Sequence, residues 1–363
     1  LKITLDRLFP GSDPQEINWQ KIAAAVASLK HFCVITGGPG TGKTFTVTKV
    51  LALLLEQVPG QKLQIYLAAP TGKAAARLKE AVEQAKSRMN CDESIKAAIP
   101  SEAFTIHRML KPMSGSPYFR HNRENPLMAD VVVVDEASMV DLALMAKLLA
   151  AVPENARLIL IGDKDQLASV EAGSVLGDIC ARNVMHGFSA PFMNLIKELT
   201  GEDLELQVQT TGAPSGLQDA IVVLQKSYRF AAGSGIGALS RAVNRADPEA
   251  AFQMLADKND KSITWQALKA DKGLSENLSR QIVSGYQTYL KTGDPAATLE
   301  RLQRFKILCA LNIGPLGVHA INGLAEQVLR RHNLIQPDTI TENQWYVGRP
   351  VLITRNHYPL GLF

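Results

Sequence analysis

Four short runs of apolar, mostly β-branched residues recur in the first half of the chain, at residues 31–36, 64–69, 131–134 and 156–161. Each run is shorter than a buried helix needs, and each is followed by polar or turn-forming residues. Continuously apolar strands are typical of a parallel sheet that helices cover on both faces. The pattern therefore predicts an α/β fold with a parallel sheet flanked by helices.

Helical periodicity fills the intervals between these runs and returns later in the chain. We predict helices at residues 17–27, 45–57, 72–89, 236–244, 248–256 and 278–291, and further strands at 305–310 and from 345. Residues 186–218 show no regular pattern and predict an irregular insertion. We expect two domains, one over 17–222 and a second, incomplete α/β domain over 223–363, with 1–16 as a linker from a domain that precedes it.

The first apolar run ends in G-G-P-G-T-G-K-T, which comprises Gly37, Gly38, Pro39, Gly40, Thr41, Gly42, Lys43 and Thr44. This segment satisfies G-x-x-x-x-G-K-[ST] between a strand and a helix, which is the context of a phosphate-binding loop. Glycines let backbone N–H groups face the β- and γ-phosphates at the positive end of the helix. Lys43 would add a charge and Thr44 a hydroxyl for Mg²⁺. A plain glycine-rich turn is the alternative, and the flanking strand and helix argue against it.

Two carboxylates follow the third apolar run, V-V-V-V, as Asp135 and Glu136. Ligands of open parallel sheets bind at the carboxyl ends of the strands. Asp135 would therefore hold Mg²⁺, and Glu136 would orient or deprotonate the attacking water. The alternative is that both are solvated turn residues.

Three further side chains are candidates for nucleotide contacts. The amide of Gln20 can donate to and accept from an adenine, although a solvated helix residue is the alternative. Gln166 follows the fourth apolar run and could contact the γ-phosphate, or simply belong to a loop. Arg229 lies in the second predicted domain and could reach the γ-phosphate from there, although an arginine before a glycine-rich turn is otherwise unremarkable.

Two polar segments are candidates for phosphate contacts of another kind. Pro70, Thr71 and Lys73 follow the second apolar run and present backbone donors and a cation, with a well-capped helix start as the alternative. His107 and Arg108 lie in a short element at 104–110, where the histidine could equally be structural.

Composition narrows the class of protein only slightly. The 39 Lys and Arg against 35 Asp and Glu give a net charge of +4 and a pI near 8.8, which permits a nucleic-acid partner without requiring one. The four cysteines lack C-x-x-C spacing, which argues against zinc and a disulfide framework and favours a reduced cytoplasm. No apolar run approaches the ~20 residues of a membrane span.

Taken in order, six segments resemble the motifs of superfamily 1 DNA helicases, and specifically of the RecD family: G-G-P-G-T-G-K-T, L-A-A-P-T-G-K-A-A-A-R-L, T-I-H-R-M-L, V-V-V-V-D-E-A-S-M, L-I-G-D-K-D-Q-L-A-S-V-E-A-G and K-S-Y-R-F. RecD is the α subunit of the bacterial RecBCD enzyme, exodeoxyribonuclease V. The resemblance implies a RecA-like domain and an ATP- and Mg²⁺-dependent 5′-to-3′ helicase for single-stranded DNA at a duplex end. It also implies RecB-like and RecC-like partners and a part in double-strand break repair and recombination in the bacterial cytoplasm.

The resemblance assigns a role to each candidate. Gln20 would read the adenine, Lys43 and Thr44 would hold phosphate and Mg²⁺, Asp135 and Glu136 would serve hydrolysis, and Gln166 and Arg229 would sense the γ-phosphate. Segments 70–73 and 105–108 would contact single-stranded DNA.

Two motifs of the family are absent from the 363 residues, one of T-V-H-K-S-Q-G type and one of T-R-A-R type that supplies an arginine finger. An arginine finger contributes about 10³ to 10⁵ in rate. We therefore expect this chain alone to bind nucleotide weakly and to hydrolyse it slowly. A nucleotide-binding scaffold without motor activity and a stand-alone RecD-like helicase are the alternatives.

Overall fold

The computed structural model describes residues 1–11, 16–167, 173, 175–180, 187–204, 217, 219–229, 234–257, 259–266, 276–336 and 345–352. The chain divides into two compact units, Leu1–Ile263 and Thr264–Phe363. Each unit is described by itself.

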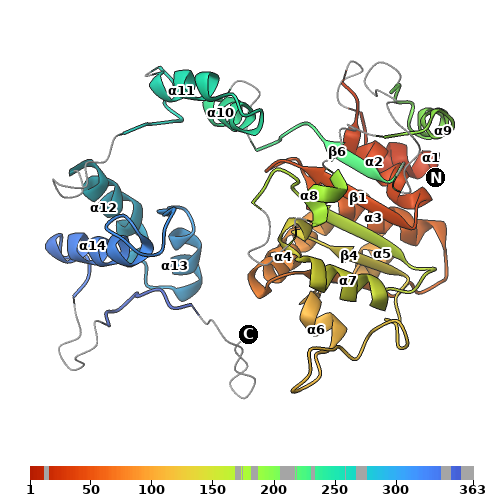
Figure 1. The fold of residues 1–363 in the computed structure, drawn as a ribbon, viewed down its shortest axis with the longest axis horizontal. Coiled ribbons are helices and arrows are strands. Elements are labelled where there is room, and N and C mark those ends of the chain that lie inside the picture. Colours follow the sequence, from red (N-terminus) through yellow and green to blue (C-terminus); the bar gives the residue numbers. More distant parts are fainter. Residues whose placement is uncertain are drawn as a thin grey trace. The chain divides into compact units, whose positions relative to one another are not determined.

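A parallel sheet forms the centre of the first unit (Figure 1). Its strands are β1 (Phe32–Gly37), β2 (Ile65–Ala69), β3 (Ala103–Thr105), β4 (Val131–Val134), β5 (Arg157–Gly162) and β6 (Ile221–Leu224). They lie in the order β3-β2-β4-β5-β1-β6, and every neighbouring pair is parallel. The predicted parallel sheet is confirmed. The two edge strands, β3 and β6, were not expected.

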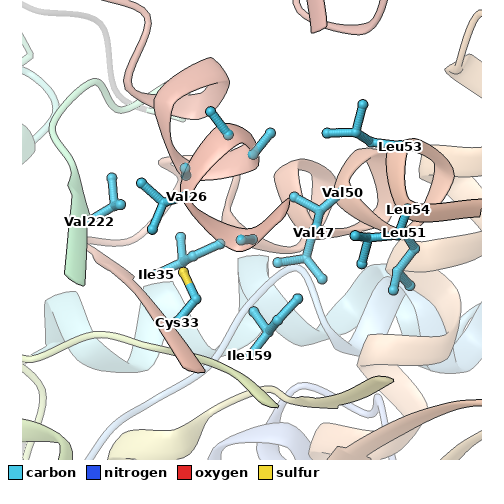
Figure 2. Close-up of a cluster of buried hydrophobic side chains, with 14 of the residues drawn as sticks. Val26, Cys33, Ile35, Val47, Val50, Leu51, Leu53, Leu54, Ile159 and Val222 are labelled. Atoms are coloured by element: carbon cyan, nitrogen blue, oxygen red, sulfur yellow. The ribbon is translucent and has the colours of Figure 1, made fainter. Parts of the chain in front are cut away.

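Within the described residues, six helices cover one face of the sheet and share a single hydrophobic core with it: α1 (Lys2–Leu8), α2 (Trp19–Leu29), α3 (Lys43–Gln57), α4 (Gly72–Arg88), α5 (Glu93–Ala98) and α9 (Ala190–Thr200). Figure 2 shows the centre of this core, where Val26 of α2 and Val47 of α3 lie beside Cys33 and Ile35 of β1. Val222 of β6 joins the same cluster.

The opposite face packs against α6 (Ile106–Leu110), α7 (Leu142–Ala151), α8 (Val175–Cys180) and the short 3-10 helix η1 (Ala137–Met139). The four valines of β4 alternate between the faces: Val131 and Val133 enter the first core, and Val132 and Val134 enter the second. A strand buried on both sides explains why the run is apolar at every position. Helices α10 (Gly235–Asn244) and α11 (Pro248–Ala256) form where their periodicity predicted helices. They lie in the first unit, however, and not in the second domain as expected.

Three expectations about the first unit are wrong. Residues 1–16 are not simply a linker, because α1 buries Leu5 and Leu8 in the core. Residues 186–218 are not wholly irregular, because α9 buries Phe192 and Ile196, which are four residues apart on one face. The expected boundary between residues 222 and 223 would cut β6, whereas the first unit continues to Ile263.

The second unit contains α12 (Glu276–Leu290), α13 (Pro295–Leu302) and α14 (Val318–Arg331), with Ile282, Val328, Leu329 and Ile335 in its core. The strand predicted at 305–310 is wrong. The ring of Phe305 packs against α12 instead, with its centroid 5.0 Å from that of Tyr286. The described residues 345–352 form no strand either, so the described part of this unit is helical rather than α/β.

None of the helices that the structure describes is long and apolar enough to cross a membrane.

Candidate nucleotide-binding site

The chain turns from β1 into α3 through a loop that requires glycine at two positions. Gly40 and Gly42 have φ angles of 77° and 79°, which is the left-handed region. A Cβ at Gly40 would lie 2.3 Å from the Cβ of Arg229, and one at Gly42 would lie 2.5 Å from Nε2 of Gln20. Thr41 closes the turn by donating its hydroxyl to the carbonyl of Gly38, at 2.9 Å. This is the kind of turn whose backbone N–H groups can surround a phosphate.

Lys43 is the first residue of α3, and its ammonium group lies over the loop. Nζ donates to the carbonyl oxygens of Gly37 and Gly38, at 2.6 and 3.1 Å. Burial lowers the pKa of Lys43, and the carboxylates of Asp163, Asp135 and Glu136 oppose that shift. A cation that is hydrogen-bonded to the loop and lies within the electrostatic influence of three carboxylates is placed to bind the phosphates of a nucleotide.

Asp135 lies directly after β4 and contacts the start of α3. The hydroxyl of Thr44 donates to Oδ2 of Asp135 at 3.2 Å, and the backbone N–H of Glu136 donates to Oδ1 at 2.8 Å. Burial raises the pKa of Asp135, and these two hydrogen bonds partly offset the shift. The predicted approach of the loop and the carboxylates is thus confirmed.

Glu136 adopts a backbone conformation that non-glycine residues rarely take. Its φ is 53°, immediately before η1. A residue in this region carries strain of about 1–3 kcal/mol and persists only where its surroundings fix it, which is most common at functional sites.

Asp163 is a buried carboxylate of the site that the sequence interpretation did not include. It is only 4% exposed and lies directly after β5, beside β1. Its Oδ2 accepts from Nε2 of Gln166 at 3.3 Å, and its Oδ1 accepts from the backbone N–H of Asp165 at 3.1 Å. The rule that selected Asp135, a carboxylate at the carboxyl end of a buried strand, would also have found Asp163. Gln166 therefore lies at the predicted edge, with its amide directed to Asp163.

Arg229 belongs to the same unit as the loop, and its expected origin in a second domain is wrong. The segment that follows β6 runs against the loop: Tyr228 donates its backbone N–H to Gly40, at 2.8 Å, and Ser227 donates its hydroxyl to the carbonyl of Pro39, at 3.0 Å. The charge of Arg229 further lowers the pKa of Lys43. The structure therefore brings Arg229 to the loop, by a different route from the expected one.

Gln20 lies at the start of α2, which Asn18 caps by accepting from the backbone N–H of Lys21 at 3.0 Å. Nε2 of Gln20 donates to the carbonyl of Thr41, at 3.0 Å. Both side chains line a cavity of about 160 Å³ beside the loop. This places Gln20 next to the phosphate-binding loop rather than on an open helix surface.

The two segments predicted to contact DNA lie next to each other on the same edge of the sheet. Ala69, before Pro70 and Thr71, pairs in register with Thr105, before His107 and Arg108. Thr71 caps α4, accepting from the backbone N–H of Ala74 at 3.2 Å, and Lys73 is exposed.

His107 and Arg108 each contact an aromatic ring. The centroid of the His107 ring lies 5.6 Å from that of Phe119, and the guanidinium of Arg108 lies 5.4 Å from the centroid of Phe104. Thr71 is therefore a helix cap and His107 packs against a ring, as the structural alternatives for these two residues predicted. Neither contact prevents a role at the surface.

The residues of the site fit a nucleoside triphosphate and Mg²⁺. The loop has the glycine conformations that a phosphate requires, and Lys43 supplies a cation beside it. The hydroxyl of Thr44 and the carboxylate of Asp135 are oxygen ligands, which Mg²⁺ prefers, and their oxygens are already adjacent.

Comparison with known proteins gives three findings. A family model described as an AAA domain matches residues 20–172. The RecBCD enzyme subunit RecD of Haemophilus influenzae is 36% identical over an alignment of 382 positions, gaps included, which covers 99% of this chain and 58% of that protein. The ATP-dependent RecD2 DNA helicase of Deinococcus radiodurans is 46% identical over 140 residues, which cover 39% of this chain and 16% of that protein.

Among solved structures, a Pif1 helicase from Bacteroides in complex with ADP-AlF3 and single-stranded DNA is 18% identical. The match covers 75% of this chain and 57% of that chain, with a TM-score of 0.36. A likeness this weak carries no weight for function.

The sheet, the loop and the adjacent carboxylates define a P-loop NTPase domain of the RecA-like class. Within that class, the chain is similar along almost its whole length to RecD proteins, at 36% and 39% identity to two of them. It spans a little more than half the length of the RecD proteins that it matches.

Proposed function

We propose that this chain is the motor portion of an ATP-dependent 5′-to-3′ DNA helicase, the RecD-like subunit of an exodeoxyribonuclease V complex in the bacterial cytoplasm. The observation that carries the proposal is the hydrogen bond between Thr44 and Asp135, which joins the phosphate-binding loop and the carboxylates in one site. Similarity over 99% of the chain to a RecBCD subunit supports this assignment, whereas similarity to a RecD2 helicase covers 39%.

The chemistry of the proposed site follows from its polar groups. The loop, from Gly37 to Gly42, and Lys43 would bind the β- and γ-phosphates, and Thr44 and Asp135 would hold Mg²⁺, which when bound would neutralise phosphate charge. Glu136 would orient the attacking water and accept its proton. Gln166 and Arg229 would contact the γ-phosphate, and Gln20 the adenine.

Single-stranded DNA at a duplex end is the proposed substrate. Pro70, Thr71 and Lys73 with His107 and Arg108 would bind its phosphates, because backbone N–H groups and cations from two neighbouring strands meet there. Contacts of this kind position a strand without reading its sequence, as a translocating motor requires. RecB-like and RecC-like subunits are the proposed partners.

The chain alone is proposed to turn over ATP slowly. Its 363 residues contain neither the T-V-H-K-S-Q-G nor the T-R-A-R motif, and a missing arginine finger reduces the rate by about 10³ to 10⁵. Steady-state ATP hydrolysis by the chain, with and without single-stranded DNA, tests this. Little turnover in both conditions is expected, and robust DNA-stimulated turnover would contradict it.

A second measurement tests the motor assignment itself. We expect Lys43→Ala in the full-length protein, assembled with RecB-like and RecC-like subunits, to abolish the ATP-dependent 5′-to-3′ unwinding contributed by this subunit. Unwinding unchanged by this substitution would show that the protein is a nucleotide-binding scaffold.

A further inference from the structure

The cavity beside the phosphate-binding loop is lined in part by residues that lie outside the six helicase-like motifs. Its lining residues come from segments 9–11, 16–20 and 224–226, together with Thr41, Lys49, Glu202 and Tyr228. Gln20 and Thr41 lie at the end of the cavity nearest the loop, where the hydrogen bond between them joins α2 to the loop. Because Thr41 of the loop and Gln20 both line it, the cavity adjoins the place where phosphates would bind and is the candidate pocket for a nucleotide base.

Residues 9–11 follow the C-terminal end of α1 and form the N-terminal part of this lining, one wall of the cavity. Phe9 is only 2% exposed and belongs to the main core of the first unit, so this end of the segment is firmly packed. Pro10 and Gly11 follow it at the cavity and are exposed. The position of the wall therefore depends on how the end of α1 is attached.

Lys49 attaches the end of α1 to α3, the helix that begins at Lys43. Nζ of Lys49 donates to the carbonyl of Leu8, the last residue of α1. The same ammonium lies 4.7 Å from the ring centroid of Phe9 and 4.6 Å from that of Phe45. A cation at a helix C-terminus and between two aromatic faces is favoured by the helix dipole and by cation–π attraction. Burial lowers the pKa of this ammonium.

Arg7 attaches α1 to α3 at a second point, away from the cavity. Its guanidinium pairs with Glu56 near the end of α3, at 2.5 Å, and donates to the carbonyl of Asn90. Arg7 does not line the cavity, whereas Lys49 does. Substitutions at these two residues can therefore distinguish a general role in docking α1 from a specific role at the cavity.

We propose that Lys49 is a positioning residue for the nucleotide base: it fixes segment 9–11 as a wall of the base pocket and so gives the site its preference for a purine over a pyrimidine. The inference rests on the proposed use of ATP and deepens it by adding the N-terminal segment to the site. Phe9, Pro10 and Trp19 contribute apolar surface to a lining that is otherwise largely polar, and the larger ring system of a purine gains more from that surface.

Equilibrium binding of ATP, CTP and inorganic tripolyphosphate to the 363-residue chain, with Mg²⁺, tests the proposal. Lys49→Met keeps an unbranched side chain that is one heavy atom shorter and removes its charge. We expect it to weaken ATP about tenfold, to bring the ratio of ATP to CTP affinity close to one, and to leave tripolyphosphate binding unchanged. Lys49→Arg should restore the ratio, and Arg7→Met should keep it.

Several outcomes would overturn the inference while leaving the proposed function intact. These are a wild-type ratio in folded Lys49→Met, an equal loss in Arg7→Met, or a wild-type chain that binds ATP without preferring it to CTP. If Lys49→Met fails to fold, Phe9→Leu alters the same wall without a charge change, and it must lower the ratio for the proposal to stand. Weak binding is expected of the chain alone, so the titrations extend to the highest soluble ligand concentrations. A wild-type chain that shows no saturable binding of any of the three ligands there would contradict the proposed function instead.

Discussion

The hydroxyl of Thr44 and the carboxylate of Asp135 are hydrogen-bonded at 3.2 Å across 91 residues of sequence. The contact arises because β1 and β4 are separated only by β5 in the sheet, and all three run in the same direction. The loop after β1 and the carboxylates after β4 must therefore meet at one edge. The two oxygens proposed to hold Mg²⁺ are adjacent as a consequence of strand order.

Removing this hydroxyl should destabilise the protein in the absence of metal. Thr44→Val preserves the shape of the side chain but removes a donor from a buried carboxylate, and we expect the free energy of unfolding to fall by about 1 kcal/mol. Thr48→Val is the matched control, because its hydroxyl donates to a backbone carbonyl of the same helix. Urea denaturation in the presence of EDTA measures both, and equal stability of the two variants would contradict the role given to the contact.

Gly40 should not tolerate even alanine. Its left-handed backbone and the closeness of Arg229 predict that Gly40→Ala lowers the free energy of unfolding by about 1–3 kcal/mol. Gly38→Ala is the control, since a Cβ there would meet nothing within 4 Å. Thermal denaturation of the two variants without nucleotide is the measurement. A Gly40→Ala protein as stable as Gly38→Ala would show that the segment after β6 is not packed on the loop.

Leu224 should behave as a core residue of the first unit, although the sequence placed it in the second domain. It is 3% exposed at the end of β6, and we expect Leu224→Ala to lower the free energy of unfolding by about 2–5 kcal/mol. Leu149→Ala on α7 is the comparison, since Leu149 is 50% exposed and the change should cost at most about 0.5 kcal/mol. A loss of stability as small as that of Leu149→Ala would show that Leu224 is not a core residue of the first unit. It would favour the predicted domain boundary between residues 222 and 223.

Cys180 should react slowly with alkylating agents in the folded protein. Burial raises the pKa of the Cys180 thiol to about 11, and the thiolate is the reactive form. Alkylation by iodoacetamide should therefore accelerate roughly tenfold per pH unit between pH 8 and pH 10. Peptide mass spectrometry can follow it, with the urea-unfolded chain as the reference. A rate at pH 8 equal to that of the unfolded chain would show that α8 does not bury this thiol.

The sequence predicted the central strands and the loop because each carries a strong local signal. The strand Val131–Val134 is recognisable from its four consecutive valines, and the loop is recognisable from the spacing of its glycines and lysine. The edge strand β6 escaped because its pairing with β1 is a long-range contact that no local pattern encodes. The strand predicted at 305–310 shows the converse, since an apolar run forms a strand only where a partner strand accepts its hydrogen bonds.

The sequence predicted which residues approach one another at the candidate site better than it predicted which parts of the fold carry them. Thr44 and Asp135 lie together as expected, because the end of a parallel strand determines where a side chain lies. Their roles, and that of Lys43, stay predictions. Arg229 was assigned to the wrong unit, because its position depends on the turn that follows β6. Asp163 was missed, although its neighbour Gln166 was chosen from the same segment.

The most direct test of the shared nucleotide site is a double-mutant cycle on Mg²⁺-dependent ATP affinity. Isothermal titration of the wild type, Thr44→Val, Asp135→Asn and the double variant gives the coupling between the two side chains. If both hold the same ion beside the loop, each single change weakens Mg²⁺-dependent binding, and the double variant binds about as weakly as the weaker single one. Fully additive losses, or an Asp135→Asn protein with wild-type dependence on Mg²⁺, would contradict the account.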